Sequence, residues 1–248
     1  MRLVCGFIMI LIRTHHKTGT VWMLRVFMGI ADKLNLRFCN LQEGFIPSAD
    51  LYLSPHAPFP NELTEGNFRG LHLIRDPRDV VLSGMHYHRR STEEWLCVPE
   101  SEYGGLSYQE KLNSLDDDER LYFEMQYAGY ATTRDMLDWD YDDSRFLEMR
   151  YEDLIGMSGR ALFNEALRFI GFSRQDLDWG TEMFTQNSLF TMGFKTPPDD
   201  PHIRSGRPAQ WRTEFRRRHG RRFLEILGDS LIRLGYERDN NWVEQLPE

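Results

Sequence analysis

Residues 13–22 read Arg13-Thr14-His15-His16-Lys17-Thr18-Gly19-Thr20-Val21-Trp22. The apolar run Phe7 to Ile12 precedes them and is typical of a buried strand of a parallel sheet. Apolar residues recur at helical spacing after them, which predicts a helix beginning near Thr20. Backbone N–H groups at such a strand–turn–helix junction point toward an anion, and Lys17 and the helix dipole favour its charge. The stretch therefore predicts an anion-binding loop, although an ordinary strand-to-helix turn remains the alternative.

Other segments along the 248 residues alternate between strand and helix patterns, which predicts an α/β fold with a central parallel sheet flanked by helices. The length suits a single domain over residues 1–248. Predicted strands lie at 50–54, 70–74 and 146–151, and predicted helices at 77–88, 117–139, 161–170 and 223–234. Residues 91–118 lack periodicity, so we expect an irregular lid or acceptor-binding segment at about 89–118. The ligand site of such a sheet lies at the carboxyl ends of its strands, where Lys17 is placed.

Cysteine usage and the N-terminal residues bear on the compartment. Cys5, Cys39 and Cys97 are odd in number and lack metal-ligand spacing, which favours a reducing, cytoplasmic setting and no metal. The apolar stretch up to Ile12 lacks a small-residue cleavage site and is far shorter than the ~20 residues of a spanning helix. We expect it to be a core strand, and we expect no membrane partner.

The net charge of −8 is unevenly distributed. Residues 93–153 hold eighteen acidic against five basic side chains, a local net charge of −13. Residues 203–222 hold eight arginines against one glutamate, a local net charge of +7. An acidic protein with one arginine-rich segment is unsuited to nucleic acid, whose backbone its acidic face repels, but it can bind a compact polyanion.

The loop differs from the common nucleotide loop G-x-x-x-x-G-K-[ST], because Lys17 precedes the only glycine. This order weakens a kinase or GTPase interpretation. The order Lys-Thr-Gly-Thr-x-Trp resembles the 5′-phosphosulfate loop of the cytosolic-type sulfotransferases, whose usual form is Lys-Ser-Gly-Thr-Thr-Trp.

Three further motifs resemble the same family in the same order. Arg75 and Ser83 stand eight residues apart, as in its 3′-phosphate motif, although surface ion pairs around a capped helix are the alternative for this segment. Tyr151 lies in a Tyr-Glu-Asp segment. Residues 204–212 resemble the C-terminal phosphate-binding loop through Arg204 and Gly206, with Ser205 between them in place of the usual Lys. The resemblance spans residues 14 to 212, nearly the whole chain.

The resemblance implies a P-loop-like three-layer fold and sulfuryl transfer from 3′-phosphoadenosine 5′-phosphosulfate (PAPS), with 3′-phosphoadenosine 5′-phosphate (PAP) as product and no metal. Lys17 and the amides of Thr18, Gly19, Thr20 and Val21 would hold the 5′-phosphosulfate. Trp22 would stack on the adenine, unless it is core packing, and Tyr151 would contact the adenine edge.

His56 is the only histidine between Gly19 and Gly70, where the family places its general base. A neutral imidazole suits that role near pH 7, although a structural role is the alternative. Val21 and Ser54 depart from the family pattern, as do Ser205 and the residues near Ala209. These changes point away from the best-known animal enzymes and toward a bacterial-type member.

The acceptor, a hydroxyl or amine of a small molecule or glycan, does not follow from the sequence, nor does the oligomeric state. Two other functions remain open: a small P-loop-type kinase, and an inactive protein that binds PAP or PAPS.

Overall fold

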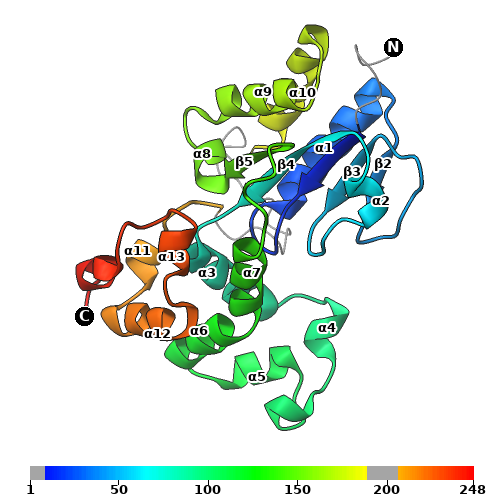
Figure 1. The fold of residues 1–248 in the computed structure, drawn as a ribbon. Coiled ribbons are helices and arrows are strands. Elements are labelled where there is room, and N and C mark those ends of the chain that lie inside the picture. The colour runs from blue at the N-terminus through cyan, green and yellow to red at the C-terminus, as the bar shows by residue number, and fades with distance from the viewer. Residues whose placement is uncertain (1–8, 189–205) are drawn as a thin grey trace. The chain divides into compact units, whose positions relative to one another are not determined.

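The apolar residues before Thr14 form β1 (Met9–Arg13), the central strand of a five-stranded parallel sheet in the computed structural model (Figure 1). The structure describes residues 9–188 and 206–248. The sheet order is β2-β3-β1-β4-β5, and all four strand pairs are parallel. The other strands are β2 (Phe38–Asn40), β3 (Leu51–Ser54), β4 (Phe68–Ile74) and β5 (Phe146–Arg150). The predicted α/β fold with a central parallel sheet is confirmed.

The described chain forms two compact units. The sheet unit comprises residues 9–75 and 140–188, and the helical unit comprises residues 76–139 and 206–248. The single domain predicted over residues 1–248 stays a prediction.

Three helices of the sheet unit build its main core. They are α1 (Thr20–Leu34), α9 (Gly159–Phe169) and α10 (Arg174–Gln186), and α10 packs against both others. Met23, Val26, Phe27 and Ile30 form the buried face of α1, at the spacing that predicted this helix. The short helices α2 (Asn61–Thr64) and α8 (Tyr151–Ile155) follow β3 and β5.

The helical unit contains a second apolar core. Its longer helices are α3 (Pro77–His88), α5 (Tyr108–Ser114), α6 (Asp117–Gln126), α7 (Ala128–Leu137) and α12 (Arg217–Leu227). Its shorter elements are α4 (Glu94–Cys97), η1 (Ser101–Tyr103), α11 (Trp211–Glu214), α13 (Ser230–Arg233) and η2 (Asn240–Gln245). Asp76 caps α3, because its carboxylate accepts the Arg78 amide at 2.9 Å.

The single helix predicted over 117–139 is wrong, since α6 and α7 are separated at Tyr127. The backbone of Tyr127 (φ −115°, ψ −96°) is not helical. The chain continues close to α3, because a Cβ on Gly129 would lie 2.7 Å from the Val81 side chain. The apolar pattern runs through the break and therefore hides it.

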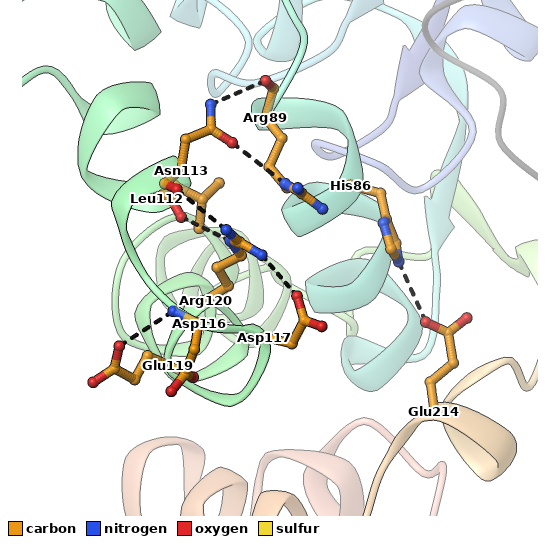
Figure 2. Close-up of polar contacts among 9 residues, drawn as sticks. All are labelled: His86, Arg89, Leu112, Asn113, Asp116, Asp117, Glu119, Arg120 and Glu214. Carbon is orange, nitrogen blue, oxygen red and sulfur yellow. Dashed lines mark hydrogen bonds and ion pairs between the residues drawn. The ribbon is translucent and has the colours of Figure 1, made fainter.

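The segment at 89–118 contains the short elements α4, η1 and α5 with turns between them. Ser107 and Glu110 form a capping box at the start of α5. Arg120 closes its other end, donating to the carbonyls of Leu112 and Asn113 at 3.1 Å each (Figure 2). The role of residues 89–118 as a lid or acceptor-binding segment stays a prediction.

Within the two described ranges, no helix is both long and apolar enough to cross a membrane.

Candidate active site

The predicted anion loop follows β1 as a tight turn built around His15. The His15 carbonyl accepts hydrogen bonds from the hydroxyls of Thr18 and Thr20, each at 2.9 Å, and from the Thr18 amide at 3.2 Å. The His15 amide in turn donates to Thr18 Oγ1 at 2.9 Å. Lys17 (φ 61°) and Gly19 (φ 112°) take the left-handed conformation that a sharp turn requires. Thr18 therefore shapes the loop through its hydroxyl.

Helix α1 begins without a capping side chain. Its first internal hydrogen bond runs from the Met23 amide to the Gly19 carbonyl at 3.0 Å. The amides of Thr20, Val21 and Trp22 consequently have no acceptor inside the helix. No acidic residue lies in the first turn. These amides and the helix dipole form a positive end suited to an anion, as the sequence predicted.

Gly19 is required by its surroundings as well as by its backbone angle. A Cβ there would lie 3.1 Å from Tyr151 Cδ2. Tyr151 is buried, and its ring meets Trp22 edge-on with centroids 6.0 Å apart. Trp22 also packs on Phe184, with centroids 4.9 Å apart, at the border of the main core. Trp22 therefore packs against the core, which was the alternative interpretation of this residue. Its stacking on adenine stays a prediction.

Arg75, at the end of β4, braces the loop. Its guanidinium donates to the Lys17 carbonyl at 3.0 Å and lies 4.5 Å from the centroid of the Tyr151 ring. Arg75 is 4% exposed, so the contact fixes a buried cation beside the turn. The family resemblance assigns Arg75, Lys17 and Tyr151 to the same ligand. In the structure Arg75 contacts both of the others.

His56 lies just beyond β3 and is exposed. Its ring faces that of His16 with centroids 5.4 Å apart, so the segment after β3 and the loop after β1 meet. The buried Arg13 supports this segment, donating to Ser54 Oγ at 3.4 Å and to the Ala57 carbonyl at 2.5 Å. Sequence reasoning missed Arg13, and its charge within an apolar strand was the available signal.

A second group of predicted residues lies in the helical unit. Ser83 is half-buried on α3, and Gly206 has a positive φ of 65°. Asp79 accepts hydrogen bonds from the amides of Ala209 at 2.7 Å and Trp211 at 3.1 Å. Helix α3, which carries Ser83, therefore binds the backbone of residues 209–211 through Asp79.

Arg78 is a structural residue of this unit. It is 1% exposed, pairs with Asp76 at 2.7 Å and Glu237 at 2.6 Å, and lies 3.5 Å from the centroid of the Trp211 ring. The alternative of a surface ion pair for this residue is wrong, because the pair is buried. Arg204 and Ser205 lie outside the described residues.

The protein-family model of the sulfotransferase domain matches residues 46–235, about three quarters of the chain. The chain belongs to the sulfotransferase family. The matched range begins after the anion loop and includes His56, Arg75, Ser83 and Tyr151. No curated protein sequence matches this chain.

Two solved structures resemble the fold. The mouse sulfotransferase SULT7A1, complexed with PAP, is 14% identical, with a TM-score of 0.58 over 97% of this chain and 88% of that one. A retinol dehydratase, in complex with androsterone and the inactive cofactor PAP, is 16% identical, with a TM-score of 0.54 over 90% of this chain and 80% of that one. At these identities the likeness concerns the fold.

The family match confirms the predicted function: this sulfotransferase transfers the sulfuryl group of PAPS to an acceptor. The roles of single residues remain predictions.

Proposed function

We propose that the loop at Lys17 binds the 5′ end of the donor, and that His56 is the general base of sulfuryl transfer. The observation that carries this proposal is the uncapped start of α1, where three amides lack acceptors inside the helix and Lys17 precedes them in the same loop. An anionic group placed there completes the cap and meets the positive end of the helix dipole.

The donor fits the residues of the sheet unit. Gly19 lacks the Cβ that would press on Tyr151, and the buried Trp22 Nε1 has no hydrogen-bond partner within the described parts of the chain. Lys17 and the amides of Thr20 and Val21 would hold the 5′-phosphosulfate, and Tyr151 the adenine. The resemblance assigns the 3′-phosphate to Arg75, Ser83, Arg204, Ser205 and Gly206.

Sulfuryl transfer requires the protein to stabilise the leaving phosphate and to accept the proton of the acceptor. The bond from sulfur to the bridging phosphate oxygen breaks, and a bond from sulfur to the acceptor oxygen or nitrogen forms. The electron pair of the broken sulfur–oxygen bond leaves with the phosphate of PAP, where Lys17 neutralises the growing negative charge. The acceptor proton passes to the imidazole of His56.

Two substitutions test the assignment of the base. We expect His56→Ala to lower transfer of labelled sulfate from PAPS by about 100-fold or more, within the range of general-base catalysis, and to leave the Kd for PAP within about twofold. His16→Ala is the matched control, because it removes the ring next to His56 and should leave sulfate transfer near the wild-type level. Unchanged transfer by His56→Ala would remove His56 from the mechanism.

The acceptor is a hydroxyl or amine, and we propose a neutral or cationic small molecule. The support is the acidic residue content of 93–119, largely within the segment expected to bind the acceptor, which disfavours polyanionic glycans. A panel of phenols, alcohols, amines and sulfated or neutral glycans, assayed with labelled PAPS and EDTA, tests the class. Preferred transfer to an anionic glycan would contradict it.

A further inference from the structure

A chain of three side chains lies behind the anion loop in the sheet unit. Glu148 Oε2 lies 2.5 Å from His72 Nδ1, and His72 Nε2 lies 2.7 Å from His15 Nε2. His72 and His15 are fully buried, whereas the Glu148 side chain is 34% exposed. The chain therefore runs from the surface at β5 to the base of the loop.

The sheet register brings these residues together. His72 on β4 is the register partner of Glu148 on β5 and of Arg13 on β1. Side chains in register on neighbouring parallel strands lie on the same face of the sheet. His15 follows two residues after Arg13, at the end of β1. The contact is thus built into the strand pairing.

The tautomers of the two rings can be assigned from these hydrogen bonds. An ionised carboxylate only accepts, so we assign a proton on His72 Nδ1 that is donated to Glu148. In a neutral His72 ring Nε2 is then an acceptor, and His15 Nε2 donates to it. These contacts hold His72 through both ring nitrogens and His15 through Nε2.

His15 is also the residue around which the loop is bonded. Its carbonyl holds Thr18 and Thr20, and its amide holds Thr18. Fixing the His15 ring therefore fixes the peptide groups that set the positions of Lys17 and of the first amides of α1. We propose that Glu148 and His72 are positioning residues that act through His15 on the loop and so set its affinity for the 5′-phosphate of the donor.

This inference rests on the proposed donor role of the loop. Removing His72 would leave a buried His15 N–H without its acceptor, whereas water can replace part of the Glu148 side chain, which is 34% exposed. The effect on binding should therefore be larger for His72 than for Glu148.

Calorimetry with PAP and with adenosine 3′-monophosphate, which lacks the 5′-phosphate, tests the inference. We expect His72→Phe to raise the Kd for PAP about tenfold and Glu148→Leu about fivefold, with the Kd for adenosine 3′-monophosphate within twofold of the wild type. Glu148→Gln keeps an acceptor oxygen and should stay within twofold for both ligands. The exposed Glu62→Gln is the control elsewhere in the unit.

A double variant provides the second readout. Side chains that act through one series of hydrogen bonds do not contribute independently. The double variant His72→Phe/Glu148→Leu should therefore bind PAP no more weakly than His72→Phe alone. Additive losses, equal losses for both nucleotides, or unchanged PAP affinity in the folded variants would overturn the inference. If His72→Phe does not fold, the Leu and Gln variants of Glu148 decide. Failure of the wild type to bind PAP would instead refute the proposed donor role.

Discussion

Each unit of the molecule buries a histidine against a glutamate. In the sheet unit His72 Nδ1 faces Glu148 at 2.5 Å, and in the helical unit His88 Nδ1 faces Glu124 at 3.0 Å. The pairs differ in what else they contact. His72 continues to His15 of the loop, whereas Glu124 continues to the Tyr108 hydroxyl at 2.9 Å.

The second pair is enclosed within packing. The His88 ring meets the rings of Trp95 and Tyr108 edge-on, and Glu124 is 1% exposed. Burial, with the neighbouring carboxylate, raises the pKa of Tyr108 far above its ordinary value, so its hydroxyl stays a donor. The same residue types therefore serve stability in one unit and, by our inference, the loop in the other. What the pair connects to decides its role.

The largest expected effect comes from one substitution made in both pairs. Glu124→Leu leaves the buried donors of His88 and Tyr108 without their acceptor, and we expect a loss of about 3 kcal/mol in the free energy of unfolding. The Kd for PAP should stay within twofold. Glu148→Leu should lose about 1 kcal/mol or less, because its site is open to water. Urea denaturation and calorimetry check both, and the reverse pattern would break the comparison.

Gly84 offers a second route into the helical pair. A Cβ at this position would lie 2.2 Å from Glu124 Oε1, so Gly84→Ala must displace the buried carboxylate. We expect a loss of about 2 kcal/mol in unfolding free energy, within the usual cost of overpacking, by thermal denaturation. Gly66→Ala is the control, since its nearest neighbour is 3.5 Å away. Equal stability of the two variants would show that Glu124 is not held rigidly.

In the sheet unit the corresponding glycine controls the loop. Gly19→Ala strains a φ of 112° and brings a Cβ to 3.1 Å from Tyr151. We expect the Kd for PAP to rise about tenfold, because the turn and the amides of α1 must shift. A variant that binds PAP like the wild type would show that the loop tolerates this shift.

The smallest effect belongs to an ion pair near the surface. The hydrogen bond from Arg145 holds the pKa of Asp143 below its ordinary value of 3.8. A lowered pKa in the folded state adds stability above pH 3.8 that is lost as the pH falls through the folded value. Asp143→Asn should therefore cost about 0.5 kcal/mol at pH 7 and 5, and the difference should vanish at lower pH. Urea midpoints across this pH range measure it; a cost that persists at low pH would contradict the pairing.

The loop could be read from the sequence because its signals are local. The apolar run before Arg13, the glycine in the turn and the spacing after Thr20 each reflect neighbouring residues. The strand β2 was missed because it has only three residues, and α10 because Leu177, Trp179, Met183 and Phe184 are its only large apolar residues and give a weak helical pattern.

The connections within each unit could not be read in this way. His15 and His72 are 57 residues apart, and His72 and Glu148 are 76 apart. Their contact depends on the sheet register, which a single sequence does not reveal. The hydrogen bonds from Ala209 and Trp211 to Asp79 cross 130 and 132 residues for the same reason.

The most direct test of the account is a calorimetric titration of PAP into the wild type and Lys17→Met. We predict stoichiometric binding by the wild type and at least about tenfold weaker binding by the variant, because a charge-assisted contact to the 5′-phosphate is lost. No binding by the wild type, or equal binding by a folded Lys17→Met, would contradict the claim that this loop holds the donor.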